Sequence, residues 1–126
     1  MAINVLIVDD SETVRAVLAK ALRIGGIDVG EVHEAEHGAA ALEILKDAWI
    51  DLVLADINMP VMDGEQMVLK MAEDGLLNTI PTIIVSTDGS RERAERLSAK
   101  GVRAFVRKPF TPESLRQAVH NVLGLE

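Results

Sequence analysis

The sequence predicts an α/β fold in which a five-stranded parallel sheet is covered by helices on both faces. Short β-branched runs alternate along the chain with longer segments of helical periodicity. Three of these segments, NVLIV, DLVLA and TIIVS, read as apolar runs rather than as alternating ones, which is typical of strands buried on both faces. The length of 126 residues suits one domain built around one core.

The first part of the chain is expected to form two strands and two helices. Ile3 to Val8 is the first strand, and its apolar run is too short for a membrane span. Ser11 then caps a helix with apolar residues at i, i+3 and i+4 spacing, which stops at Gly25-Gly26. Val32 to Ala35 is a weaker strand, and Gly38 to Asp47 is a short helix with its leucines facing inward.

The middle of the chain continues the alternation. The apolar run Asp51 to Ala55 is the third strand, and a helix follows over about Gly64 to Asp74. Pro81 introduces the fourth strand, Thr82 to Ser86. Ser90 caps a charged helix with the sequence RERAERLSAK, which is expected to be solvated and to contain an i, i+4 pair of Glu92 with Arg96.

The last two elements complete five strands and five helices. Arg103 to Arg107 is the fifth strand. Thr111 and Pro112 then occupy the cap and first position of a final helix with one apolar face. In open sheets of this kind, ligands bind beyond the carboxyl ends of the strands, where the strand order reverses.

Composition and charge exclude several classes of protein. A formal charge of −7 and a pI near 4.9 argue against direct binding of nucleic acid, which requires clustered basic residues. The absence of cysteine excludes disulfides and thiolate metal sites and is compatible with the cytoplasm. The N-terminal sequence MAINVLIVDD has no basic region of the kind that begins a signal peptide. We therefore expect a cytoplasmic protein that binds neither membrane nor nucleic acid directly.

Polar residues gather at the carboxyl ends of the predicted strands. The first strand ends on Asp9-Asp10, the third on Asp56, the fourth on Ser86 and the fifth on Lys108. Each taken alone has an ordinary explanation, such as a helix cap, a hydroxyl bonded to nearby backbone or a solvated lysine. Together they place three carboxylates, a hydroxyl and an ammonium at one edge of the sheet.

Three neighbouring carboxylates repel one another unless a cation lies among them. Carboxylate oxygens suit a hard divalent ion such as Mg²⁺, and no histidine or cysteine at these strand ends favours a softer metal. An aspartate in such a site can act as a nucleophile toward phosphorus and form an acyl phosphate. The metal and Lys108 would then offset charge on the phosphoryl oxygens, and Ser86 would donate a hydrogen bond to one of them.

The motifs VLIVDD, DINMPVMDG, IPTIIVST and VRKPFTPESL, in this order, resemble the receiver domain of two-component response regulators. The resemblance is strongest to the single-domain, chemotaxis-type (CheY-like) members and covers essentially the whole chain. It implies a doubly wound, flavodoxin-like sheet of order 2-1-3-4-5. It also implies that residues 1–126 form one receiver domain without an output domain in this chain.

The resemblance assigns roles to the residues of the site. Asp56 would accept a phosphoryl group from a phosphohistidine on a histidine kinase or phosphotransfer protein. Asp10, Asp56 and the backbone carbonyl of Asn58 would bind Mg²⁺, with Asp9 acting largely through water. Lys108 would pair with the phosphoryl group, and the Lys108-Pro109 peptide bond is expected to be cis.

The resemblance also implies a switch and a set of residues that tune the phosphoryl lifetime. The Ser86 hydroxyl would move toward the phosphoryl group, and Phe105 would turn into the space it leaves. The surface of the fourth helix, fifth strand and fifth helix would then change for an output protein. Asn58 and Asp88 stand at positions that influence attack by water, and the bulk of Thr87 is expected to slow small phosphodonors.

Phe105 also fits plain core packing, and it lacks the hydroxyl of the tyrosine often found at its position. The remaining candidates have ordinary roles. The three histidines match no metal spacing, and the methionines after Asp56 are expected to serve packing.

The leading hypothesis is a phosphorylated signalling switch, not an enzyme, that shows Mg²⁺-dependent self-phosphorylation from small donors and autodephosphorylation. It would act in two-component signalling, with chemotaxis as one such pathway. It is expected to be a monomer, and dimerisation on phosphorylation is left open. The alternatives are a receiver excised from a larger regulator, a non-phosphorylated scaffold and an aspartyl-phosphate phosphatase. The last would usually carry its aspartate pair as D-x-D after the first strand.

Overall fold

The computed structural model describes residues 2–124 and shows a five-stranded parallel sheet of order β2-β1-β3-β4-β5. The predicted doubly wound fold and its strand order are confirmed. The strands are β1 (Ile3–Val8), β2 (Val29–Ala35), β3 (Leu52–Ala55), β4 (Thr82–Ser86) and β5 (Ala104–Arg107). The helices are α1 (Glu12–Ile24), α2 (Gly38–Asp47), α3 (Gly64–Glu73), α4 (Leu76–Thr79), α5 (Arg91–Lys100) and α6 (Pro112–Leu123).

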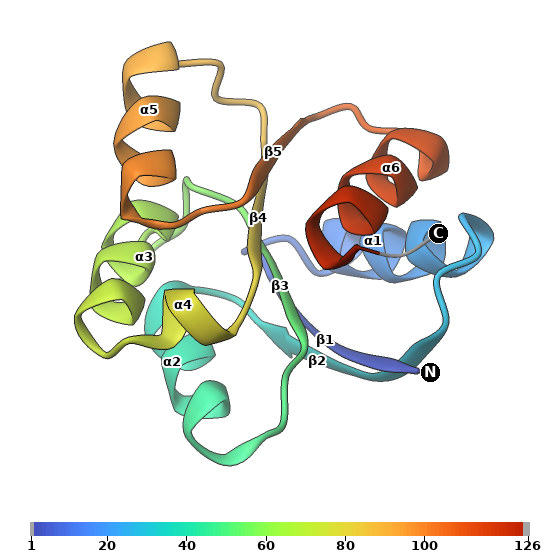
Figure 1. Ribbon diagram of the computed structural model, residues 1–126, viewed down its shortest axis with the longest axis horizontal. Helices are drawn as coiled ribbons and strands as arrows, with labels where there is room; N and C mark the ends of the chain where they lie inside the picture. The colour runs from blue at the N-terminus through green and yellow to red at the C-terminus, as the bar shows by residue number, and fades with distance from the viewer. Residues whose placement is uncertain (1, 125–126) are drawn as a thin grey trace.

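Helices cover both faces of the sheet (Figure 1). Helices α1 and α6 lie on one face, and α2, α3, α4 and α5 lie on the other. Strands β1, β3 and β4 are buried along most or all of their length, which is why their sequences are continuously apolar. Successive strand residues point to opposite faces of the sheet and pack into two separate cores, one on each face.

Three of the helix caps are those that the sequence predicts. Ser11, Ser90 and Thr111 each accept a hydrogen bond from a backbone N–H in the first turn of the following helix. His37 caps α2 in the same way, since its Nδ1 accepts from the backbone N–H of Ala40 at 3.1 Å. This contact gives one of the three histidines a structural role.

Two differences from the predicted elements have local causes. Strand β2 begins at Val29 rather than Val32, because pairing with β1 and a hydrogen bond from the Glu31 N–H to the Asn4 side chain support residues of low strand propensity. The short helix α4 was not predicted, because four residues are too few to show a period. With it, the chain has six helices in its described part.

Candidate functional site

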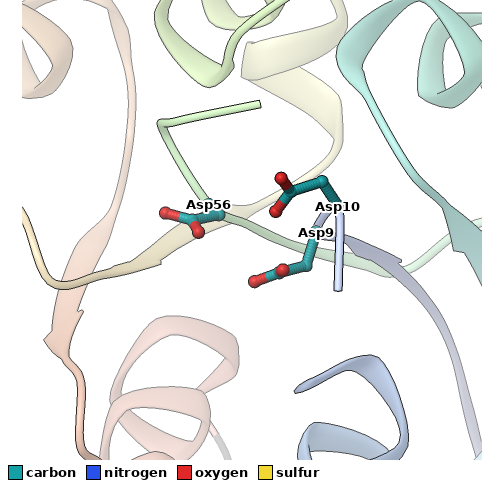
Figure 2. Close-up of side chains that lie close together, drawn as sticks. All are labelled: Asp9, Asp10 and Asp56. Carbon is teal, nitrogen blue, oxygen red and sulfur yellow. The ribbon is translucent and has the colours of Figure 1, made fainter. Parts of the chain in front are cut away.

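The three predicted metal-binding aspartates lie together at the carboxyl edge of the sheet. Strands β1 and β3 are neighbours, and the register pairs Val8 with Ala55, so the residues that follow them emerge side by side. Figure 2 shows the carboxylates of Asp9, Asp10 and Asp56 directed to the same side, and one oxygen from each lies within 4.8 Å of the other two. Asp9 and Asp56 are buried, whereas Asp10 is exposed.

Lys108 reaches this cluster from the segment after β5. Its ammonium donates to Asp9 Oδ2 at 2.8 Å and to Asp56 Oδ2 at 2.9 Å. Burial alone would lower the pKa of Lys108, but its hydrogen bonds to the two carboxylates outweigh burial and raise that pKa above its ordinary value. Lys108 is therefore a charged group that offsets two buried negative charges.

The second oxygen of each buried carboxylate is bound by backbone. Asp9 Oδ1 accepts from the N–H of Ser11 at 2.9 Å, and Asp56 Oδ1 accepts from the N–H of Ile57 at 2.6 Å. Arg15 fixes the backbone of the first loop, because it donates to the Asp9 carbonyl at 2.7 Å and to the Glu34 carboxylate at 2.7 Å. The two carboxylates are thus held in fixed orientations.

The donors at this edge fit a hard divalent cation. Three carboxylates from two adjacent loops converge, and the one that is exposed, Asp10, opens the cluster to solvent. Oxygen donors of this kind suit Mg²⁺. Asn58, which is predicted to add its carbonyl, lies exposed two residues after Asp56.

The other residues of the predicted site follow β4. Ser86 is buried, and its Oγ accepts from the backbone N–H of Asp88 at 3.1 Å, which leaves the hydroxyl proton free to donate elsewhere. The Ser86 carbonyl accepts from the N–H of Lys108 at 3.0 Å, so the ends of β4 and β5 are tied together. Thr87 is exposed at the surface beside them.

Phe105 does not pack in the core, since 40% of its surface is exposed. It lines an open groove of about 780 Å³ between β5 and α6, together with Arg103, Arg107, Gln117 and Asn121. The plain packing role considered from the sequence is therefore wrong for this residue. The Lys108-Pro109 peptide bond is cis, as the family resemblance implies.

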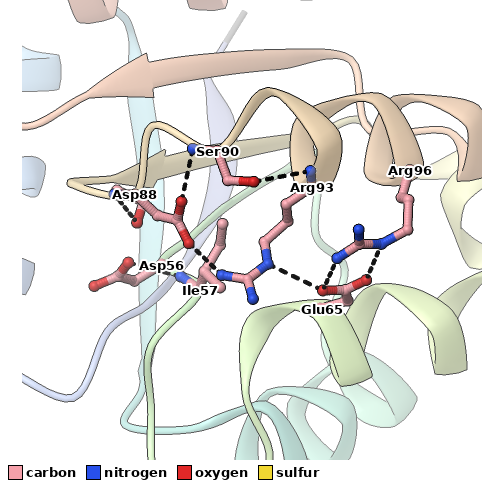
Figure 3. A network of polar contacts seen from close by, with 8 residues as sticks. Asp56, Ile57, Glu65, Asp88, Ser90, Arg93 and Arg96 are labelled. Carbon is pink, nitrogen blue, oxygen red and sulfur yellow. Dashed lines mark hydrogen bonds and ion pairs between the residues drawn. The ribbon is translucent and has the colours of Figure 1, made fainter.

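A network of ion pairs beside the site was not predicted. Asp88 pairs with Arg93 of α5, Arg93 Nε donates to Glu65 of α3 at 3.1 Å, and Arg96 bonds both oxygens of Glu65 (Figure 3). Within residues 2–124 the Arg96 guanidinium makes its ion pair with Glu65 and not with Glu92; the pKa of Arg96 is raised chiefly by Glu65, and the charge of Glu92 adds to this. Only the acidic and basic composition of the two helices hinted at these contacts.

Comparisons with known proteins agree with this geometry. The family model for the response regulator receiver domain matches residues 5–120. This chain belongs to the response regulator receiver family. The receiver is 37% identical over 123 residues to the chemotaxis protein CheY1 of Helicobacter pylori, covering 96% of this chain and 97% of that protein.

Two further likenesses extend over nearly the full length of the receiver. It is 35% identical to the chemotaxis protein CheY homolog of Campylobacter jejuni, covering 96% of this chain and 92% of that protein. The solved structure of the chemotaxis protein CheY4 of Vibrio cholerae superposes with a TM-score of 0.84 at 31% identity, covering 97% and 99% of the two chains. Among the described residues, the receiver has no helix of the length and apolarity that a membrane span requires.

Proposed function

We propose that this receiver is the phosphoacceptor of a two-component signalling pathway and that Asp56 is its acceptor residue. The observation that carries the proposal is the position of Lys108, whose ammonium bridges Asp56 and Asp9 at the sheet edge. A buried carboxylate with a lysine on one oxygen is suited to receive a phosphoryl group, because the ammonium can transfer its hydrogen bond to a phosphoryl oxygen.

The reaction transfers a phosphoryl group without net oxidation or reduction. An Asp56 carboxylate oxygen bonds to the phosphorus of a phosphohistidine, the phosphorus–nitrogen bond breaks, and its electron pair returns to the imidazole. Lys108 offsets charge on the phosphoryl oxygens, and the buried Ser86 hydroxyl donates to one of them. The receiver supplies the acceptor and the positioning groups rather than turning over a substrate as an enzyme.

Asp10, Asp56 and the carbonyl of Asn58 would hold Mg²⁺, with Asp9 contributing through water. When bound, the ion offsets negative charge on the carboxylates and on the incoming phosphoryl oxygens. The protein's own residues do the remaining work: Asp56 forms the bond to phosphorus, and Lys108 and Ser86 bind the phosphoryl oxygens.

The output surface is assigned to α5, β5 and α6, which are the fourth helix, fifth strand and fifth helix predicted from the sequence. Residues 91–107 carry six arginine and lysine residues against two glutamates, although the whole chain has a formal charge of −7. The half-exposed Phe105 lies at the groove in this surface. We infer a chemotaxis-type output partner with an acidic, partly apolar binding segment, favoured when phosphorylation shifts Ser86 and Phe105.

The test is the intact mass of the protein after incubation with acetyl phosphate and Mg²⁺. The wild type should gain one phosphoryl group, and the gain should disappear with EDTA and in Asp56→Asn. Asp47→Asn is the matched control, since Asp47 is an exposed aspartate at the end of α2, remote from the strand ends. Thr87→Ala should react faster with acetyl phosphate, because it opens access to Asp56. Failure of the wild type to gain mass, from acetyl phosphate and from a phosphorylated histidine kinase, would refute the proposal.

A further inference from the structure

The loop between β4 and α5 is held by contacts that connect Ser86 of the site with helix α5. Asp88 in this loop makes three of them: its backbone N–H donates to Ser86 Oγ, one carboxylate oxygen accepts from the Ser90 N–H at 2.8 Å, and the other pairs with Arg93. The first contact reaches the hydroxyl that is expected to meet the phosphoryl group. The position of Asp88 therefore bears directly on Ser86.

Arg93 in turn is held between two carboxylates. Its guanidinium pairs with Asp88 on one side and with Glu65 on the other (Figure 3). The side chains of Asp88, Arg93 and Glu65 are 17%, 32% and 23% exposed, so solvent screens these pairs less than ordinary surface pairs. Glu65 lies in the first turn of α3 and is held further by Arg96.

Both carboxylates are favoured in their ionised form. The pKa of Asp88 is lowered chiefly by the hydrogen bond from the backbone N–H of Ser90, and then by the charge of Arg93. The pKa of Glu65 is lowered chiefly by its hydrogen bonds from Arg96, and then by the charge of Arg93. Near neutral pH the network is thus a row of alternating charges that runs from the phosphorylation edge to α3.

We propose that Arg93, anchored by Glu65, is a positioning residue that holds the Asp88 carboxylate toward α3 and α5, and so lengthens the life of the phosphoryl group on Asp56. The inference rests on the proposed function. Arg93 directs the Asp88 carboxylate toward α3 and α5 and offsets its charge. Asp88 then keeps its backbone N–H on Ser86 Oγ, with the hydroxyl proton available to a phosphoryl oxygen.

Loss of the phosphoryl group is a hydrolysis. The oxygen of a water molecule bonds to phosphorus, the bond from phosphorus to the Asp56 oxygen breaks, its electron pair returns to the carboxylate, and the water gives up a proton. A carboxylate released from its arginine at the edge of the site is a base for that proton. Removing Arg93 therefore speeds hydrolysis in a manner that depends on the charge of Asp88.

The experiment follows the loss of phosphoryl mass after the acetyl phosphate has been removed by desalting, with Mg²⁺ present. Arg93→Gln should shorten the half-life by about threefold or more, and Glu65→Gln should shorten it less. The half-life of Arg93→Lys, which keeps the positive charge, should lie between those of Arg93→Gln and the wild type. Arg23→Gln is the matched control, because it removes one exposed arginine from the last turn of α1, on the other face of the sheet, and should leave the half-life unchanged.

A double variant separates positioning from general loosening of the fold. In an Asp88→Asn background, Arg93→Gln should have no further effect on the half-life, since the carboxylate it releases is gone. The inference is overturned if Arg93→Gln decays like the wild type, or if it shortens the half-life equally in the Asp88→Asn background. Should Arg93→Gln not fold, as judged by circular dichroism, the comparison of Glu65→Gln with and without Asp88→Asn decides in the same way. A wild type that takes up no phosphoryl group would refute the proposed function instead.

Discussion

Replacing Lys108 with methionine should make the stability of the receiver strongly dependent on Mg²⁺. The ammonium lies 2.8 Å from Asp9 and 2.9 Å from Asp56, and its side chain is only 16% exposed. At an effective dielectric constant of about 20, each pair is worth roughly 6 kcal/mol before the ammonium's loss of hydration is subtracted. Breaking such a buried pair by removing one partner costs about 3–5 kcal/mol, because the other charge is left uncompensated.

We take about 3 kcal/mol for Lys108→Met, because water reaches part of the site. For a chain of this length, that loss lowers the melting temperature by about 10 °C. The assay is thermal unfolding in EDTA and again with Mg²⁺. Ion at about 100 times its Kd adds about 2.7 kcal/mol to a protein that binds it only when folded.

The variant should gain more stability from Mg²⁺ than the wild type does, because its carboxylates have lost their competing ammonium. Lys20→Met on the exposed face of α1 is the control and should melt like the wild type in both conditions. A Lys108→Met protein that melts within about 3 °C of the wild type in EDTA would refute the electrostatic account of the site.

Three other changes test the backbone and the ion-pair network. Gly64→Ala should destabilise the fold by about 3 kcal/mol and slow phosphorylation, because the new Cβ would clash with the Asp56 carbonyl oxygen. Chemical denaturation measures the loss of stability, and the rate of reaction with acetyl phosphate measures the slower phosphorylation. Val61→Asn should stabilise by about 1 kcal/mol in thermal unfolding, because Val61 is exposed and has a φ of 65°, which asparagine tolerates better. Glu65→Gln should destabilise by about 1 kcal/mol at pH 7. Since arginines hold the pKa of Glu65 below its ordinary value, this difference should shrink as the pH falls through that lowered pKa.

Each of these changes has a control or a contrary outcome. Gly38→Ala is matched to Gly64→Ala, because its closest contact, at 2.9 Å, is a methionine side chain rather than backbone, and it should cost less. Equal losses in the two variants would argue against a special constraint at Asp56. An unchanged or lower melting temperature for Val61→Asn would contradict the strain argument. A Glu65→Gln difference that stays constant between pH 7 and pH 3 would contradict the assigned ion pairs.

The sequence was sufficient for the sheet order and for bringing Asp9, Asp56 and Lys108 to one edge. Apolar periodicity, cap residues and family motifs are local patterns, and the strand ends follow from them. The network of Glu65, Arg93 and Asp88 was beyond reach, because side-chain pairing between helices leaves no period in the sequence. The exposure of Phe105 also could not be read from the chain, since an aromatic residue in an apolar strand has the same pattern whether it faces a core or a groove.

The two cores described above divide the molecule thermodynamically. Leu22 and Leu115 pack on the α1 and α6 face, whereas Leu45 and Leu97 pack on the other, with the sheet between them. Truncations on opposite faces should therefore be nearly additive in unfolding free energy, and pairs on the same face should couple. Each helical layer can therefore accumulate substitutions independently, as long as the contacts of Lys108 with Asp9 and Asp56 at the carboxyl edge are kept.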